Sequence, residues 1–257
     1  MRKDLLMLAF ALPGLLCSCQ KSRESTGETT LIRATLDEAR TSLSFPAILW
    51  SAEDAICVNG QISGKANISD GGRSATFALQ GTVDAPYYAL YPGAAFITGS
   101  FRPAYDRYGS VTLPAVQTCP AGNFDASAAI MGACSGTAED PSQLRFSCLV
   151  AFLKIRIILP EGSLTPQSIE VSANGREDLC GDFSYDPAAG RLKNSKLQGK
   201  SISADCRNAA VSDHPVYIAI PAKTYTSGLT LKIKDGSRQY MELKSMKSFS
   251  AGAGKIY

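Results

Sequence analysis

Two cysteines near the start of the chain, Cys17 and Cys19, could serve metal binding, redox chemistry or the attachment of a lipid. They close an apolar run from Leu5 to Leu16, which is shorter than the roughly 20 residues that span a bilayer. A basic start, a short apolar run and then small residues form the pattern of a secretory signal. Because the small Ser18 precedes Cys19, whereas a leucine precedes Cys17, we expect residues 1–18 to be a lipoprotein signal peptide and Cys19 to be lipidated.

The alternative for this segment is an ordinary secretory signal with two incidental cysteines. A metal or redox pair is not expected, because both cysteines lie at the edge of a segment that is discarded. The residues that follow, through Thr30, are polar and lack large apolar side chains, which indicates a flexible tether over residues 19–30.

Six further cysteines lie in the rest of the chain: Cys57, Cys119, Cys134, Cys148, Cys180 and Cys206. The nearest two, at positions 134 and 148, are fourteen residues apart, so the short-spaced pairs of zinc sites are absent. An exported chain can form disulfides, but six cysteines allow fifteen connectivities, and the pairing stays open.

Candidate catalytic groups are few. The single histidine, His214, stands in SDHPVYIAI at the expected start of a strand, with no nucleophile motif around it. Three carboxylates, Glu177, Asp178 and Asp182, flank a cysteine in REDLCGD, but nothing in the sequence places a pair across a cleft. No phosphate-binding, dinucleotide or zinc-protease motif occurs. We expect no catalytic residue, no metal site and no cofactor.

Charge and aromatic content bear on partners. The net charge of +3 gives no basic stripe of the kind that binds nucleic acid, so no nucleic acid partner is expected. Tyr87, Tyr88 and Tyr91 in APYYALYPG could stack on a sugar, although we expect at least one of them to pack inward. Trp50, the sole tryptophan, is expected to anchor a core.

The elements that must position these residues are short strands. They are rich in β-branched or aromatic residues and bounded by turn residues, as in LIRATL, AICV, ATFALQ, YYALY, SIEVS, VYIAI and LTLKI. Residues 229–244 predict a hairpin around Asp235-Gly236, with Leu231 on the first strand and Leu243 on the return strand facing a core. In DASAAIMGACS, Asp125 could cap a short helix, or the segment could be a strand. The pattern predicts an all-β protein, a sandwich or barrel.

A polar stretch at residues 135–143 suggests a boundary between two β domains, 31–142 and 143–257. The segment after it, LRFSCLVAFLKIRIILP, alternates in one phase as far as Phe152 and in the other phase from Leu153. We expect a bulge in one long central strand there.

Several motifs of the chain resemble those of the fimbrillin-like proteins. The first is RTSLSFPAILWSAEDAICV, whose matching residues are Arg40, Thr41, Leu43, Trp50, Asp54, Ile56 and Val58, with Glu53 in place of the usual glycine. The others follow in the family's order: YYALYP, FDASAAIMGA, RFSCLVAFLKIRI, VYIAIPAKTYTSGLTLKIKDGSRQY and FSAGAGKIY.

The resemblance implies two tandem β-sandwich domains of transthyretin-like topology and export as an outer-membrane or cell-surface lipoprotein. It also implies a non-enzymatic, pilin-type structural or adhesive subunit. Its partners would be other fimbrial subunits joined by donor-strand exchange, the membrane through the lipid, and a host or glycan ligand. A monomeric glycan-binding surface lipoprotein is the alternative.

In polymerising members of that family, cleavage after an arginine removes the first strand. Here the strand would be TTLIRATLDE and the cleavage site Arg40, because a cut after Arg33 would split the strand's apolar alternation. The alternative is that Arg40 is a solvated loop residue and is not cut. The chain closes at GKIY, where the family's last core strand would finish, so we expect no donor strand at that end.

Overall fold

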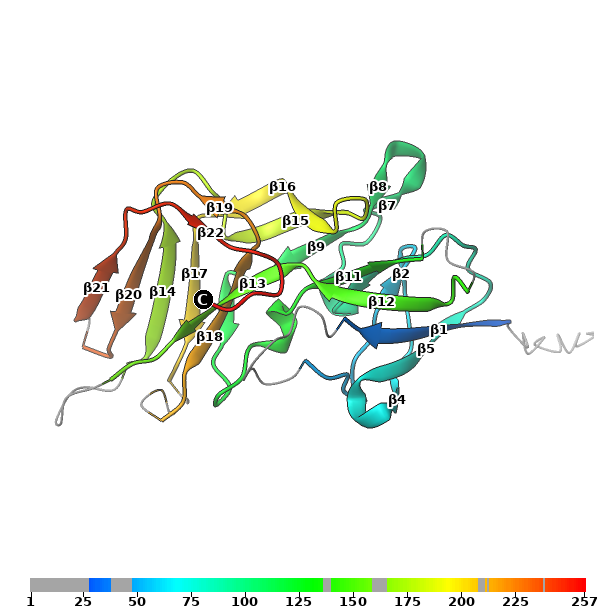
Figure 1. The fold of residues 1–257 in the computed structure, drawn as a ribbon, viewed down its shortest axis with the longest axis horizontal. Helices are drawn as coiled ribbons and strands as arrows, with labels where there is room; N and C mark the ends of the chain where they lie inside the picture. Colours follow the sequence, from blue (N-terminus) through cyan, green and yellow to red (C-terminus); the bar gives the residue numbers. More distant parts are fainter. Residues whose placement is uncertain are drawn as a thin grey trace, which may run out of the picture.

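The computed structural model describes residues 28–37, 48–135, 140–158, 166–207, 211, 213–237 and 239–257. Over these residues the chain is all-β, as the sequence predicts, with β-strands, turns and a few single-turn 3₁₀ segments. The strands form an elongated molecule in which the first and last thirds of the chain lie toward opposite ends (Figure 1). No helix in the described ranges has the length and apolar character needed to cross a membrane.

The largest sheet contains the N-terminal strand in its interior. In spatial order its eight strands are β3 (Gln61–Ile62), β2 (Cys57–Val58), β6 (Tyr88–Tyr91), β11 (Met131–Cys134), β12 (Gln143–Cys148), β1 (Thr29–Leu36), β5 (Ser74–Gln80) and β4 (Asn67–Ser69). Strand β1 runs parallel to β12 and antiparallel to β5.

The remaining strands form one sheet of five, one of three and three pairs. The five-stranded sheet is β10 (Val116–Thr118), β17 (Ser201–Asp205), β14 (Ser168–Ala173), β20 (Leu229–Lys234) and β21 (Tyr240–Lys244). The three-stranded sheet is β16 (Arg191–Gly199), β15 (Cys180–Asp186) and β9 (Ser110–Leu113). The pairs are β13 (Val150–Ile155) with β18 (Val216–Pro221), β19 (Thr224–Tyr225) with β22 (Phe249–Ser250), and β7 (Phe101–Arg102) with β8 (Arg107–Tyr108).

The bulge expected near residue 153 is not found, because β13 pairs with β18 in continuous register from Val150 to Ile155. Strand β12 ends at Cys148, and β13 begins at Val150 in a different sheet. The intervening Leu149 donates its backbone N–H to the carbonyl of Ile130. The apolar run therefore serves two sheets in succession. Both faces of β13 are covered, since Val150 and Phe152 join one buried cluster and Ala151 joins the other.

The pairing of strands across the expected boundary does not follow a simple division at residue 142. β12 lies inside the sheet of β1, while β9 and β10 pair with β15 and β17 from the second half. One buried cluster joins Ile32, Trp50 and Phe146 to Phe183 and Tyr185. The other cluster is centred on the five-stranded sheet and the β13–β18 pair, and it also includes Cys180 of β15 and Tyr225 of β19. The two-domain count and the transthyretin-like topology stay predictions.

Turn chemistry follows the sequence closely. Asn59 and Gly60 both have positive φ, 50° and 87°, as a two-residue turn between β2 and β3 requires. The segment after Asp125 is first a 3₁₀ turn, Ala126–Ala128, and then strand β11, so each alternative describes part of it.

The hairpin of β20 and β21 is confirmed, with Leu231 opposite Leu243 and Ile233 opposite Met241. Its return strand does not face a core, contrary to the prediction, because β21 is an edge strand and all five of its residues are exposed. The side chains of Met241 and Leu243 are 62% and 68% exposed.

Candidate strand-exchange site

Strand β1 occupies an interior position that only an extended segment can fill. Residues Arg33 to Leu36 lie opposite Gln143 to Phe146 of β12, and Thr29 to Thr35 lie opposite Gln80 to Ser74 of β5. Both backbone edges of β1 are therefore paired. If the strand left, β5 and β12 would each expose a row of unsatisfied N–H and C=O groups.

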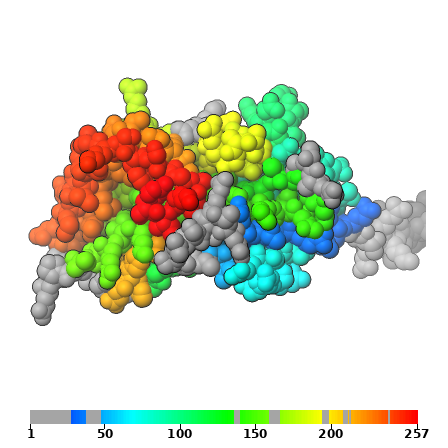
Figure 2. Space-filling model, in the orientation of Figure 1, coloured from blue at the N-terminus to red at the C-terminus, as the bar shows by residue number. Residues whose placement is uncertain are grey.

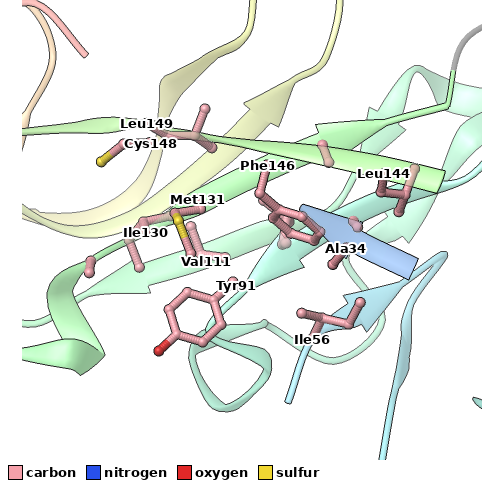
Figure 3. Packing of buried hydrophobic residues seen from close by; sticks show 14 of the residues in the cluster. Ala34, Ile56, Tyr91, Val111, Ile130, Met131, Leu144, Phe146, Cys148 and Leu149 are labelled. Carbon is pink, nitrogen blue, oxygen red and sulfur yellow. The ribbon is translucent and has the colours of Figure 1, made fainter. Parts of the chain in front are cut away.

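The inner face of β1 belongs to the core around the sole tryptophan. Ile32 and Ala34 are fully buried members of the same cluster as Trp50. The Trp50 ring meets Phe77 of β5 and Phe146 of β12 edge to face, with ring centroids 5.2 and 5.3 Å apart. Figure 3 shows Ala34 in the region of Leu144, Phe146 and Ile56. Loss of β1 would thus open an apolar slot beside the aromatic cluster.

The outer face of β1 is accessible to solvent. Burial alternates along the strand, because Ile32 and Ala34 point inward while Leu31 and Arg33 point outward. Figure 2 shows this face as a blue stripe between the green of β12 and the cyan of β5. The Arg33 guanidinium binds the Asp140 carboxylate at 2.6 Å, and this pair is exposed, so it stabilises the strand only weakly.

Polar contacts fix the two ends of the strand. Thr30 donates its hydroxyl to the carbonyl of Gly81 at 2.9 Å and accepts the N–H of Val83 at 3.0 Å. At the other end, the N–H of Asp37 donates to the carbonyl of Phe146. These contacts set the register of β1, and so set which residues enter the core.

The predicted signature around Trp50 and Asp54 forms the turn that leads into β2. The Asp54 carboxylate accepts the N–H of Ser51 at 2.7 Å and the hydroxyl of Tyr91 at 3.0 Å. Burial, together with the Asp54 charge and this hydrogen bond, raises the pKa of Tyr91 above its ordinary value. Glu53, which stands where a glycine is usual, is not among the residues with positive φ, so this turn does not need glycine there.

Two residues were predicted to undergo covalent processing, by lipidation and by cleavage. Cys19 and Arg40 both fall outside the described residues.

Asp140, in contrast, was not predicted from the sequence to hold β1. It also accepts the N–H and the hydroxyl of Ser142, at 3.1 and 2.5 Å, so it organises the start of β12. The opposite charges of Arg33 and Asp140 were visible in the sequence, but their proximity depends on the parallel pairing.

Solved structures of similar overall fold are known for this chain. No family model matches the chain, and no curated protein matches it. A crystal structure of a "putative cell adhesion protein" from Bacteroides uniformis matches with a TM-score of 0.51 and 16% identity, covering 89% of this chain and 91% of that one.

This chain has the fold of that protein. The resemblance stated from the sequence is confirmed at the level of the fold. Two further matches were found. A "putative cell adhesion protein" from Bacteroides ovatus has a TM-score of 0.49 at 12% identity, covering 86% of this chain and 89% of that one. The tip fimbrial protein Mfa3 from Porphyromonas gingivalis, with a C-terminal truncation, has a TM-score of 0.37 at 12% identity, covering 84% and 80%.

The other candidate residues do not converge on a site. His214 is exposed and lies two residues before the start of β18, near the strand entry where it was expected. Glu177 accepts the N–H and hydroxyl of Thr226, both at 2.6 Å, whereas Asp182 accepts the hydroxyl of Thr112 on β9 at 2.7 Å. These carboxylates brace separate loops and strands. Within the described ranges, no group of three or more His, Cys, Asp or Glu residues could hold a metal ion.

The aromatic side chains considered for sugar stacking have mixed environments. Tyr87 and Tyr91 are buried, and Tyr87 donates its hydroxyl to the carbonyl of Val83 at 3.0 Å. Tyr88 is half-buried and packs on Tyr108, with ring centroids 4.4 Å apart. Of the three tyrosines considered for sugar stacking, only Tyr88 is partly open to solvent. Trp50 is buried and anchors the core, as predicted.

Proposed function

We propose that this chain is a non-enzymatic cell-surface lipoprotein that acts as a structural or adhesive subunit of a fimbria. Cys19 carries the lipid that attaches it to the outer membrane. Cleavage after Arg40 frees β1, and a strand from a neighbouring subunit takes its place. The observation that carries this proposal is the interior position of β1 between β5 and β12, directly before the segment that contains Arg40.

The physical basis is β-strand addition. A vacated β1 position offers two backbone edges and an apolar slot at once, and a donor strand that satisfies both is held far more firmly than one added to an open sheet edge. The donor must carry apolar residues at alternate positions, because Ile32 and Ala34 are fully buried. Once β1 has been cut free, the subunits are joined by backbone hydrogen bonds and apolar contacts alone.

The fold supports this proposal, since a solved structure of similar fold is described as a putative cell adhesion protein. The lipoprotein signal expected at residues 1–18 supports it independently, because such a signal predicts delivery to a membrane surface.

Limited digestion with an arginine-specific protease tests the proposal. We expect a product that begins at Thr41 and keeps a cooperative unfolding transition, because the cut would fall outside β1. The variant Arg40→Gln should resist this cut and serve as the control. A product that begins at Ala34 instead, or general unfolding after the cut at Arg40, would contradict the proposal.

A second candidate, a monomeric glycan-binding surface lipoprotein, is favoured by one feature. Tyr88 packs against Tyr108 and Phe101, with ring centroids 4.4 and 6.2 Å away, at the base of the β7–β8 hairpin. Tyr105 is exposed at the end of this hairpin. A glycan array with the wild-type chain and Tyr105→Ala tests it, and sugar binding by cells that form no filaments would favour it over the fimbrial proposal.

A further inference from the structure

Two buried cysteines from distant parts of the chain meet beside the five-stranded sheet. β10 runs parallel to β17, with Thr118 opposite Asp205. Cys119 and Cys206 are the next residues in the same register, and their Sγ atoms lie 3.0 Å apart. Both are buried, and both follow the inward alternation of their strands.

We propose that Cys119 and Cys206 form a disulfide in the exported protein. Neighbouring strands lie about 4.8 Å apart, which is within the range of about 4.4–6.8 Å that separates the Cα atoms of disulfide-bonded cysteines. Closing the sulfurs from 3.0 Å to the bonded distance of about 2.04 Å takes about 1 Å of movement. The Sγ of Cys206 also lies 3.6 Å from the carbonyl of Ala204, which is farther away than the Sγ of Cys119.

The bond would join the two halves of the chain. β10 comes before the crossing at Leu149, while β17 comes after it, and 87 positions separate the two cysteines. β10 is also attached to β18, because the buried Gln117 side chain donates to the carbonyl of Ala219 and accepts its N–H, both at 2.9 Å. A covalent link here would hold β10 in place by a second means and restrict the unfolded chain.

The reaction needs an oxidant, and a small-molecule or protein disulfide supplies it. A thiolate of one cysteine attacks that disulfide, the mixed disulfide is then attacked by the second cysteine, and two thiols of the oxidant leave. Two protons and two electrons are lost by the pair, and one S–S bond forms. The hydrogen bond between the two thiols raises the pKa of Cys119 and lowers the pKa of Cys206. Cys206 is therefore the thiol that ionises first and attacks the oxidant.

Peptide mapping of the full chain tests the pairing. The chain is refolded in a mixture of oxidised and reduced glutathione, alkylated without reduction and digested with trypsin. Trypsin leaves Cys119 and Cys134 in one peptide, so a second enzyme that cuts before Asp125 is needed to separate them. The second enzyme also cuts before Asp205, so we expect a linked pair that joins the Cys119 peptide, residues 108–124, to DCR, the peptide of Cys206. Alkylation of both cysteines, or linkage of either to another cysteine, would overturn the proposal.

Thermal unfolding supplies a second measurement. The oxidised chain should unfold roughly 5–15 °C above the same chain in reductant. This difference should vanish in Cys119→Ser and in Cys206→Ser but persist in the matched control Cys180→Ser. An equal difference in all three variants would show that another bond is responsible. Neither experiment involves strand exchange, so its failure would leave the proposed function untouched.

Discussion

Leu31 and Ile32 are adjacent in β1, yet they face opposite sides of the sheet. Ile32 is fully buried in the cluster that contains Trp50, whereas the Leu31 side chain is 56% exposed. The two residues are similar in size and apolar character, so their different environments isolate the effect of register. They form a natural pair for mutagenesis.

Replacing Ile32 by alanine should lower the free energy of unfolding by about 2–5 kcal/mol, because it leaves a cavity in a packed core. The matched variant Leu31→Ala should change it by no more than about 0.5 kcal/mol, since that side chain is largely in solvent. Urea denaturation of both variants measures the difference. Equal losses, or a larger loss for Leu31→Ala, would mean that the register of β1 is wrong.

Enlarging the small residue at the centre of the strand should also be costly. Ala34 is fully buried, and Ala75 and Leu144 are its neighbours on β5 and β12. Ala34→Leu should therefore destabilise the chain by about 1–3 kcal/mol through overpacking. Thr35→Leu, on the exposed face, is the control and should be nearly neutral. Tolerance of leucine at position 34 would show that the slot has spare room.

Asp125 provides a test that depends on pH. Its carboxylate accepts the N–H and hydroxyl groups of Thr118 and Ser127 at 2.6–3.0 Å. Burial alone would raise its pKa, but the hydrogen bonds from Ser127 and Thr118 outweigh it and hold the pKa below its usual value. Because the folded-state pKa is the lower one, this stabilisation is complete above the unfolded value of about 3.9 and is lost as the pH falls below it.

Asp125→Ala should accordingly cost about 1 kcal/mol at pH 7, as the loss of a cap does. The difference from the wild type should shrink between about pH 4 and pH 2, where the wild-type carboxylate becomes protonated. Chemical denaturation at these pH values measures it. A difference that stays constant down to pH 2 would show that the ionised carboxylate contributes nothing.

The local features were readable from the sequence because neighbouring residues determine them. The Asn59-Gly60 turn, the cap at Asp125 and the β20–β21 hairpin all depend on residues only a few positions apart. Their φ preferences and side-chain hydrogen bonds act within a few positions. The core role of Trp50 was also predictable from its apolar neighbours.

The pairing between distant strands was not readable in this way. Nothing in RFSCLVAFLKI reveals that Phe146 belongs to the sheet of β1 while Phe152 belongs to the next, since both halves of the run are apolar and alternate. The exposure of Leu243 has a similar origin. Alternation leads to burial of one face of a strand only where another layer covers that face, and the sequence does not show that β21 lacks such a cover. For the same reason, the contact between Cys119 and Cys206 required the parallel register of β10 and β17.

The proposed lipid anchor can be tested with two single substitutions near the start of the chain. Cys19→Ala should abolish incorporation of a fatty-acid analogue, whereas Cys17→Ala should leave it intact, because the small Ser18 precedes only Cys19. Metabolic labelling followed by gel analysis measures the incorporation. Labelling that persists in Cys19→Ala and disappears in Cys17→Ala would place the lipid on the other cysteine.

The most direct test of the account is replacement of β1 by a peptide. A chain that begins at Thr41 is refolded with a synthetic peptide of residues 28–37, and the emission of Trp50, the sole tryptophan, is followed as peptide is added. We expect saturable binding with a blue shift of the emission as the aromatic cluster closes. A peptide carrying Ile32→Asp should not bind, whereas one carrying Leu31→Asp should, because only Ile32 enters the core. Equal binding of the two variants, or a truncated chain as stable as the intact chain without any peptide, would contradict a role for β1 as a replaceable strand.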